Sequence, residues 1–335
     1  MSTVARRRDV RDGRVSLTSL SFGGAPIGNL YRPTSDDDAR GAVEAAWDVG
    51  IRYFDTAPHY GLGLSERRMG AVLRERPRDE LVVSTKVGRL LEPNPGATGD
   101  DDEGFAVPAT QRRRRDYSRD GVLRSLEESL ERMGLDRIDV VFVHDPDEYY
   151  REVLDGAYPA LHELRDQGVV RAIGAGMNQA EMLADFARNT DMDLLMLAGR
   201  YTLLEQDALD DLLPTCKARN VSIVAAGVFN SGLLARERPP DDAKYNYEEA
   251  PRELVDRARR IADVCARHGA GLPAAALAFP LGHPSVASVC IGARSRAQIS
   301  RNAELFEARL PDDLWAELRA ERLLREDAPT PGASS

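Results

Sequence analysis

The chain has 335 residues, a formal net charge of −10 and a hydrophobic fraction of 42%. This length suffices for one large domain or two ordinary ones, and the hydrophobic fraction argues against wholesale disorder. The acidic balance argues against a general nucleic-acid-binding protein. Two short basic runs, residues 6–8 and 112–115, are flanked by Asp, and we interpret both as solvated loop charge.

Cysteine and histidine are sparse and show no pattern of a redox or metal centre. The three cysteines, Cys216, Cys265 and Cys290, lie far apart in the sequence, and the five histidines are scattered. No apolar stretch reaches membrane-spanning length, and the N-terminus lacks the apolar core of a signal peptide. We therefore expect no bound metal and no membrane or nucleic-acid partner, in a reducing cytoplasm. The oligomeric state stays open.

Eight short and nearly all-apolar runs along the chain are typical of buried parallel strands. They cover residues 20–24, 51–54, 81–85, 138–143, 169–173, 194–198, 221–226 and 286–291. A helical pattern follows each run, over residues 35–49, 65–73, 122–133, 153–164, 179–187, 205–218, 251–267 and 295–306. This alternation has no internal repeat and no linker, so it predicts an α/β fold with a single (β/α)8 TIM barrel.

Four further segments decorate the predicted barrel. Residues 1–19 alternate in polarity around an Asp-Gly turn and predict an N-terminal hairpin. Residues 88–118 and 230–250 are long polar loops after the third and seventh strands, and we expect the first of them to cover or bind a substrate. Residues 311–324 predict one extra C-terminal helix. We assign residues 1–327 to one domain and residues 328–335, rich in Pro, Gly and Ser, to a disordered tail.

Titratable side chains end three neighbouring predicted strands. Asp55 follows the second strand, Lys86 the third and His144 the fourth, while Tyr60 lies on the loop just after Asp55. Strand ends converge at the C-terminal face of such a barrel, which is where its active site lies. Any one of these residues alone has an ordinary structural explanation, but the four together predict an active site.

The predicted chemistry follows from the ordinary pKa values of these groups. A phenol has a pKa near 10 and is an inert acid at neutral pH. A Lys86 ammonium within ~4 Å would favour the Tyr60 phenolate by about three pK units, and desolvation would oppose it. We expect a net lowering of the Tyr60 pKa, with Asp55 as the counter-charge of Lys86 and His144 as a donor to the substrate oxygen.

The order of these motifs resembles the aldo-keto reductase family over nearly the whole chain. The motifs are Phe-Asp55-Thr-Ala-Pro-His-Tyr60-Gly, Ser-Thr-Lys86-Val-Gly, Val-His144-Asp-Pro, Gly-Ala-Gly176-Met-Asn178, Cys-Ile-Gly292-Ala-Arg-Ser and the run Gln298 to Asn302. The resemblance implies a (β/α)8 barrel, a nicotinamide cofactor and no metal. It also implies that Tyr60 donates or accepts the proton, that Lys86 and Asp55 tune it, and that His144 orients the carbonyl.

The family resemblance assigns the nicotinamide contacts one residue at a time. Asn178 matches the residue that binds the carboxamide, and Met177 stands where the family usually has Ser. Ala198 replaces a common Gln and Ala226 replaces a common Tyr that stacks on the nicotinamide. Phe229 is a candidate to supply the missing stack.

The remaining cofactor contacts expected from the resemblance are spread over four segments. They are Gly24 and Asp55 near the first strands, Asn230, Ser231, Gly232 and Leu234 in a pyrophosphate loop, Gly292, Arg294 and Ser295 in a phosphate-binding turn, and Gln298 and Asn302 beside the adenine. Gln298 and Gly292 depart from the cations of many NADP-preferring members, whereas Arg294 could bind a 2′-phosphate. The sequence therefore leaves both NAD and NADP open as the cofactor.

Several stretches are similar to the sugar-oxidising and pyridoxal-oxidising branch of the family, that of L-fucose or D-threo-aldose dehydrogenase and pyridoxal 4-dehydrogenase. The resemblance implies an NAD(P)-dependent enzyme that oxidises an aldose or a similar alcohol. Phe105, Arg200 and Tyr245 are candidates for the substrate pocket, with a role as solvent-facing loop residues equally open. The alternatives are a pyridoxal dehydrogenase, a broad carbonyl reductase and a non-catalytic regulatory subunit that senses the cofactor.

Overall fold

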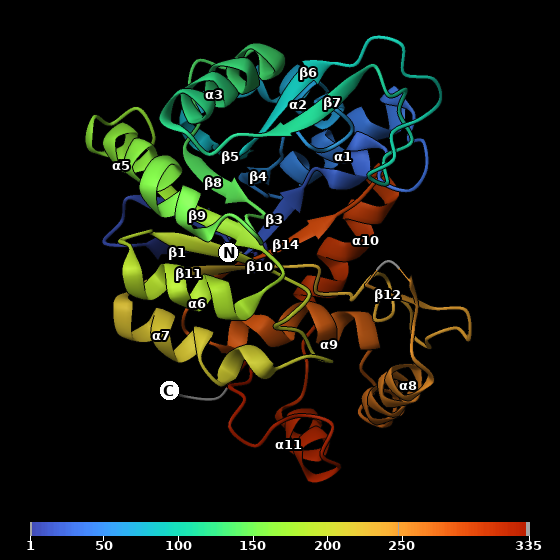
Figure 1. Ribbon diagram of the computed structural model, residues 1–335. Coiled ribbons are helices and arrows are strands. Elements are labelled where there is room, and N and C mark those ends of the chain that lie inside the picture. The colour runs from blue at the N-terminus through green and yellow to red at the C-terminus, as the bar shows by residue number, and fades with distance from the viewer. Residues whose placement is uncertain (1, 247, 333–335) are drawn as a thin grey trace.

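The computed structural model describes residues 2–246 and 248–332, and a closed barrel of eight parallel strands forms its centre (Figure 1). The predicted (β/α)8 barrel is therefore confirmed. Around the barrel the strands run in chain order, and the last pairs with the first: β3 (Leu20–Gly23), β4 (Tyr53–Asp55), β5 (Val82–Val87), β8 (Val140–His144), β9 (Ala172–Met177), β10 (Leu194–Ala198), β11 (Ser222–Ala226) and β14 (Val286–Gly292).

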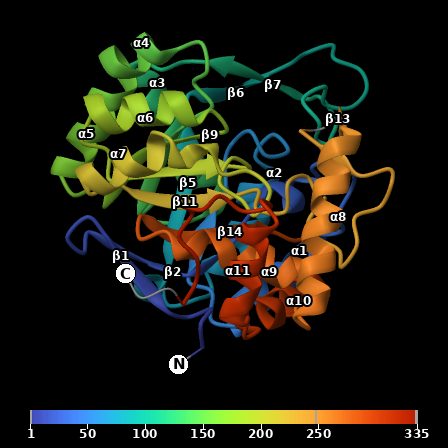
Figure 2. The ribbon, with the colours of Figure 1, turned by 90° about the horizontal axis from the view of Figure 1, so that it is seen from below.

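Helices surround the barrel and cover its outer face (Figures 1 and 2). They are α1 (Asp36–Asp48), α2 (Leu64–Leu73), α3 (Arg119–Met133), α4 (Tyr150–Glu152), α5 (Tyr158–Asp166), α6 (Ala180–Asn189), α7 (Leu212–Arg219), α8 (Arg252–Arg267), α9 (Leu272–Ala278), α10 (Arg296–Glu307) and α11 (Asp312–Ala320). Short 3-10 turns and one π-helical turn join them: η1 (Ala25–Gly28), η2 (Arg78–Glu80), η3 (Val153–Ala157), η4 (Asp207–Leu209) and η5 (Phe279–Gly282). The sequence prediction missed α9, whose Ala-rich run has no polar face.

The helix ends follow local chemistry. Ser35, Ser118 and Ser295 each accept a hydrogen bond from a backbone N–H in the first turn of α1, α3 and α10. These bonds satisfy donors that a helix start leaves without a partner. Gly134 ends α3 in the left-handed conformation that glycine adopts easily.

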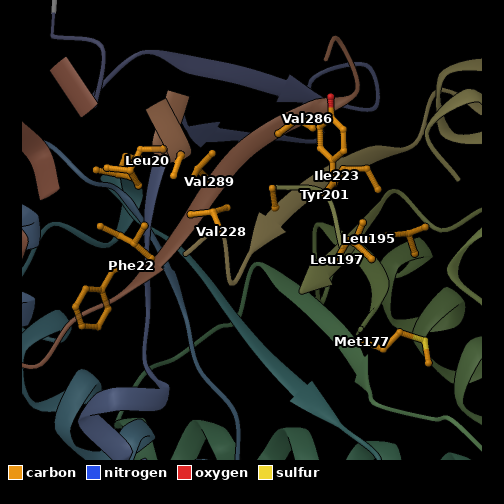
Figure 3. Close-up of a cluster of buried hydrophobic side chains, with 14 of the residues drawn as sticks. Leu20, Phe22, Met177, Leu195, Leu197, Tyr201, Ile223, Val228, Val286 and Val289 are labelled. Atoms are coloured by element: carbon orange, nitrogen blue, oxygen red, sulfur yellow. The ribbon is translucent and has the colours of Figure 1, made fainter. Parts of the chain in front are cut away.

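Two apolar layers explain why the strands are almost wholly hydrophobic. Side chains that point outward pack beneath the helices, and Figure 3 shows part of this layer with Leu195, Leu197 and Ile223. Side chains that point inward, among them Tyr53 and Phe142, fill the barrel interior. Each strand is thus buried on both faces.

The predicted N-terminal hairpin is present as β1 (Arg7–Val10) and β2 (Val15–Thr18), drawn in blue in Figure 2. Its apolar side chains Val10, Val15 and Leu17 belong to the same buried cluster as the barrel interior. The basic run 6–8 lies partly in β1, where the half-buried Arg8 donates to the carbonyl of Leu281 at 3.0 Å. The hairpin closes one end of the barrel.

Both segments predicted as long loops follow the third and seventh barrel strands as expected, and each contains a short strand pair that the sequence did not indicate. Residues 88–118 hold the antiparallel pair β6 (Arg89–Pro93) and β7 (Gln111–Arg115), and residues 230–250 hold β12 (Lys244–Tyr245) and β13 (Glu248–Glu249). The basic run 112–115 lies in β7, and Arg113 is buried against Asp101 at 2.9 Å. The pairing of β6 with β7 was not indicated by the sequence because its partners are about 20 residues apart, and β12 and β13 are only two residues long.

Strand β9 was predicted over residues 169–173 but spans Ala172–Met177. The prediction ended the strand at Gly174, whereas the glycine lies inside it. A β-carbon at Gly174 would stand 1.8 Å from the carbonyl oxygen of Leu194, so only glycine allows β10 to approach this closely.

The C-terminal segment also differs from its prediction. The extra helix is present as α11 but ends at Ala320, four residues earlier than expected. Residues 328–332 were predicted to be disordered, yet Ala328 and Thr330 are buried and accept hydrogen bonds from Arg319. That part of the prediction was wrong, and residues 333–335 lie outside the described residues.

None of the helices within residues 2–246 and 248–332 has the length and apolar character that crossing a membrane requires. In the same part of the chain, no three His, Cys, Asp or Glu side chains gather as a metal ion would need. The three cysteines are buried and free.

Replacing Gly174 by alanine tests the close contact of β9 with β10. We expect Gly174→Ala to lower the free energy of unfolding by roughly 3 kcal/mol, because the new methyl overlaps a backbone carbonyl that cannot move away. Gly41→Ala is the matched control. Its β-carbon would meet only Arg296 at 3.8 Å, so we expect a gain of about 0.5–1 kcal/mol in helix α1. Urea denaturation measures both, and equal effects would contradict this account.

Candidate active site

The structure brings the four predicted residues together at the C-terminal end of the barrel. Asp55 ends β4, Lys86 lies near the end of β5 and His144 ends β8, so three consecutive strands supply three side chains. Tyr60 reaches the same place from the turn between β4 and α2. Asp55, Lys86 and His144 are buried, although water usually covers such groups.

An ion pair forms the base of this site. Lys86 Nζ lies 2.6 Å from Asp55 Oδ2 and 2.9 Å from the carbonyl oxygen of Thr56. Ser84 Oγ donates to Asp55 Oδ1 at 2.7 Å. The ammonium and the carboxylate therefore satisfy each other in a region that excludes water.

Lys86 also faces Tyr60. Its ammonium nitrogen lies 4.7 Å from the centre of the Tyr60 ring. The ring of Tyr60 is perpendicular to that of His144, with the ring centres 5.6 Å apart. A phenol, an ammonium, a carboxylate and an imidazole thus lie side by side, as the sequence predicted.

The predicted lowering of the Tyr60 pKa was wrong for this arrangement. Burial raises the pKa of Tyr60 to about 12, and the Lys86 ammonium offsets only part of that rise. For Lys86 itself, burial works to lower the pKa, but the charges of Asp55 and Tyr60 outweigh it and the net shift is upward. Lys86 stays protonated and Tyr60 keeps its hydrogen at neutral pH.

His144 is neutral in this environment. Burial, followed by the positive charges of Arg89 and Lys86, holds its pKa well below the ordinary value. Its Nε2 lies 3.5 Å from Asp145 Oδ2. A neutral imidazole carries one N–H, which it can donate to a substrate oxygen.

The sequence prediction missed His59 as part of the pocket, although it lies between two residues of the quoted motif. Its ring centre is 5.3 Å from that of His144 and 5.0 Å from that of Phe105. Burial, with the nearby Arg89, lowers the pKa of His59 to about 2. Its position directly before Tyr60 in the sequence could have indicated that His59 lies in the same pocket.

A cavity of about 580 Å³ opens over these residues. Phe105 and Asn178, both predicted as ligand contacts, line it together with Tyr60 and His144. Polar residues that the prediction did not single out line it as well: Arg89, Glu103, Asp145 and Asp147. They come from β6, the loop before β7 and the segment after β8, which no local pattern connects.

A second cavity of about 350 Å³ lies close to the first, since the neighbouring residues Ala25 and Pro26 line the first and the second respectively. Seven predicted cofactor contacts line it, namely Phe229, Asn230, Ser231, Gly232, Gly292, Arg294 and Gln298. Asn230 Oδ1 is buried and has no hydrogen-bond partner among the described residues. Helix α10 begins beside this cavity, and a helix start favours an anion.

Arg294 lines the second cavity, but its guanidinium is occupied. It donates to the carbonyl oxygens of Pro26 at 3.0 Å and Arg32 at 3.2 Å, to Thr34 Oγ1 at 2.9 Å and to the carbonyl of Leu30. These bonds fasten residues 26–34 to the turn before α10. In the structure the Arg294 guanidinium therefore binds oxygen atoms of the protein, whereas the sequence analysis considered it as a ligand of a 2′-phosphate.

Several other predicted cofactor contacts have protein partners in the structure. The side chains of Met177 and Leu234 lie in the core beneath the helices, as Figure 3 shows for Met177. A β-carbon at Gly24 would stand 2.4 Å from Ser65 Oγ, so the protein itself requires this glycine. Ser295 caps α10, and the half-buried Asn302 lies further along that helix.

Two of the three predicted substrate residues lie outside both cavities. Arg200 donates to Tyr245 Oη at 3.4 Å and to Asn246 Oδ1 at 3.1 Å, and Tyr245 also contacts Glu205. Neither Arg200 nor Tyr245 is among the described residues that line the two cavities. The structure therefore pairs them with each other and separates them from Phe105.

The residues present fit a nicotinamide dinucleotide. The second cavity is a groove that lies beside the polar first cavity. It contains the start of a helix, a loop with Asn230 and Ser231 in the left-handed conformation, and the unbonded amide oxygen of Asn230. Asn178 lies in the pocket and Gln298 in the groove, so the two ends of a long ligand would each find a polar partner.

The sequence matches the model of the Aldo/keto reductase family over residues 19–322. A D-threo-aldose 1-dehydrogenase from a Pseudomonas species is 50% identical, in an alignment that covers 95% of this chain and 96% of the relative. A pyridoxal 4-dehydrogenase from Microbacterium luteolum is 40% identical over 92% of this chain and 95% of the relative.

Solved structures share the fold. An aldo-keto reductase from Bacillus halodurans, in a holo form, is 25% identical with a TM-score of 0.74 and covers 96% of this chain and 97% of its own. A glycerol dehydrogenase from Gluconobacter oxydans has a TM-score of 0.77 at 23% identity, covering 100% of this chain and 99% of its own.

Removal of the Lys86 charge tests the ion pair. We expect Lys86→Met to lower the free energy of unfolding by about 3–5 kcal/mol, because Asp55 would be left as a buried carboxylate without a counter-charge. The double variant Lys86→Met/Asp55→Asn removes that charge too, so it should recover a large part of the loss. Urea denaturation compares the two.

The control for this measurement is Arg119→Met, which breaks an exposed pair with Glu163 at 3.1 Å. Exposed pairs contribute little, so a change under about 0.5 kcal/mol is expected. A Lys86→Met protein as stable as this control would show that the buried pair contributes nothing.

Proposed function

We propose that this chain, which belongs to the aldo/keto reductase family, oxidises a neutral aldose and reduces a nicotinamide cofactor. The chain is an oxidoreductase, and its cofactor is NAD or NADP. The aldose substrate is our inference from the relative that is 50% identical over nearly its whole length. The observation that carries the proposal is the buried Lys86–Asp55 pair directly against the Tyr60 ring.

In the proposed reaction Tyr60 Oη exchanges a proton with the reacting oxygen. Oxidation of an alcohol requires a base for the hydroxyl proton, and the Tyr60 phenolate is that base. The Lys86 ammonium stabilises the phenolate, while Asp55 keeps the ammonium charged. His144 donates its N–H to the same substrate oxygen and so fixes which hydrogen faces the cofactor. The nicotinamide, when bound, accepts the hydride.

Other residues of the chain hold the cofactor in this proposal. Asn178 binds the carboxamide end in the first cavity, and the start of α10 with Gln298 binds the other end in the second. Asn230 offers its free Oδ1 as an acceptor. Phe229 lines the second cavity and not the first, so in this proposal it contacts the cofactor away from the nicotinamide ring that it was considered to stack on.

Pyridoxal is the second candidate substrate, since a pyridoxal 4-dehydrogenase is 40% identical and the rings of His59 and Phe105 could hold an aromatic ring. A regulatory subunit without catalysis is disfavoured by the complete set of four groups in one pocket. We also propose a cytoplasmic setting, because three free buried cysteines suit a reducing compartment. Residues 1–327 are proposed as one domain built around the barrel.

The test of this function follows cofactor reduction with a panel of aldoses, pyridoxal and simple alcohols. We expect aldose oxidation, and a rate that rises between pH 7 and pH 10 without levelling off. The pKa of Tyr60 is raised to about 12, so the fraction of phenolate grows about tenfold for each pH unit in this range. Tyr60→Phe should lower kcat/KM by at least about 100-fold and leave cofactor binding intact.

A matched control is Tyr53→Phe, because Tyr53 is also buried beside Ser84 but lies in the barrel interior. It should keep most of the activity. Turnover of pyridoxal alone would favour the second candidate, and full activity of Tyr60→Phe would reject the proposed base.

We further propose that NAD is preferred over NADP. A 2′-phosphate needs a nearby cation. Arg294 is bonded to the segment 26–34, and Arg296 pairs with Asp48 at 2.9 Å and Glu44 at 3.1 Å. Both cations at the start of α10 are thus committed, whereas the neutral Gln298 remains in the groove.

Fluorescence titration with the two reduced cofactors tests this preference. We expect a Kd for NADH at least about tenfold below that for NADPH. Gln298→Arg places a cation at the groove and should tighten NADPH binding while changing NADH binding little. Equal affinities in the unmodified protein would contradict the proposal.

A further inference from the structure

We propose that Glu103, together with Arg89 and His59, binds hydroxyl groups of a neutral aldose and so determines substrate specificity. This inference rests on the proposed function and concerns residues apart from the four at the base of the pocket. Glu103 lies in the segment between β6 and β7, and it lines the same cavity as Tyr60 and His144. Its side chain is 44% exposed, so a ligand can reach it.

The Glu103 carboxylate is surrounded by donors but bonded to none of those described. Its Oε2 lies 3.6 Å from Arg89 Nη1 and 3.7 Å from His59 Nδ1, and its Oε1 lies 3.6 Å from Arg113 Nη1. Hydrogen bonds between such atoms are normally 2.7–3.2 Å long, on the order of half an ångström shorter. The charges hold the carboxylate in place, and its lone pairs stay available.

A buried polar atom beside Glu103 lacks a partner. His59 Nδ1 is buried without a hydrogen bond among the described residues. Arg89 is 6% exposed, and its Nη1 is the guanidinium nitrogen nearest to Glu103. Buried polar atoms are nearly always bonded, so unbonded ones beside a cavity indicate that a ligand completes them.

A hydroxyl group has the chemistry that this spacing requires. It can donate its hydrogen to Glu103 Oε2 and accept one from Arg89 Nη1 or His59 Nδ1 at the same time. Two polar atoms 3.6–3.7 Å apart can both reach one oxygen at normal hydrogen-bond length. An aldose carries several such hydroxyls along its chain.

The donors are held before any ligand arrives. Arg89 Nη2 is bonded to Asp145 Oδ2 at 2.7 Å. Arg113 donates to Asp101 Oδ2 at 2.9 Å and to the carbonyl oxygen of His59 at 3.0 Å, which joins the β6–β7 segment to the loop that carries Tyr60. A preorganised site loses little entropy when it binds.

The charge of the cavity wall selects neutral molecules. Arg89 is its one cation among the described lining residues, whereas Glu103, Asp145 and Asp147 are carboxylates. A phosphorylated or carboxylated sugar would meet like charges there, which opposes binding. We therefore expect neutral aldoses to be oxidised at least about tenfold more efficiently than aldose phosphates.

The experiment combines Glu103→Gln with aldoses that each lack one hydroxyl. In the unmodified protein, loss of the hydroxyl bound by Glu103 should lower kcat/KM about tenfold or more, mainly through KM. Glu103→Gln should cause a similar loss with the parent aldose. In that variant the deoxy sugar should be oxidised about as well as the parent, because the charged acceptor that strengthened the bond is already gone. Reduction of methylglyoxal, whose free carbonyl form has no hydroxyl, should stay unchanged.

Asp102→Asn is the matched control, since Asp102 is the exposed neighbour of Glu103 on the same loop and should leave all these rates unchanged. The inference is overturned if Glu103→Gln keeps the full penalty for every deoxy sugar. It also fails if that variant slows methylglyoxal as much as aldoses, or if aldose phosphates are preferred. Absence of aldose oxidation in the unmodified protein would reject the proposed function itself. Aldose oxidation at a rate that does not change in Glu103→Gln would instead reject only the role of Glu103.

Discussion

The buried pair between Lys86 and Asp55 is the interaction on which the site depends. An isolated ammonium inside a barrel would lose its proton, and an isolated carboxylate would gain one. At 2.6 Å each keeps the other charged. Ser84 donates a further hydrogen bond to the Asp55 carboxylate, and the carbonyl oxygen of Thr56 accepts one from the Lys86 ammonium. Adjacent parallel strands hold the two groups in register, so the barrel supplies the rigidity that the pair requires. The Lys86 ammonium in turn works to lower the pKa of both Tyr60 and His144.

Burial acts on each of these groups in its own way. It raises the pKa of Tyr60 and lowers the pKa of both His59 and His144, since desolvation always opposes the charged form. The result is a pocket in which the histidines are neutral donors and the phenol keeps its proton. Such a pocket favours proton donation at neutral pH and proton abstraction as the solution becomes alkaline. The attraction of Lys86 reduces this bias but does not reverse it.

The site has two parts with different structural origins. Barrel strands and the turn after β4 position the groups that would handle the proton, whereas the β6–β7 segment positions Phe105 and Glu103 beside them. The segment is fastened by Arg113 and Arg89, whose partners lie on the loops after β4 and β8. Separate scaffolds allow the substrate pocket to vary while the charged base of the site stays the same.

The sequence by itself determined the barrel, because strands buried on both faces and helices with one apolar face leave a pattern that local reading detects. It also indicated the four groups of the candidate site, because three of them end predicted strands and Tyr60 lies on the loop after one of these strands. Tertiary structure alone decided the extent of β9, the pairing of β6 with β7 and the partners of Arg294, which depend on contacts between distant segments. It likewise decided the direction of the Tyr60 pKa shift. That direction depends on whether desolvation outweighs the attraction of Lys86, and no sequence pattern records how much water the folded pocket excludes.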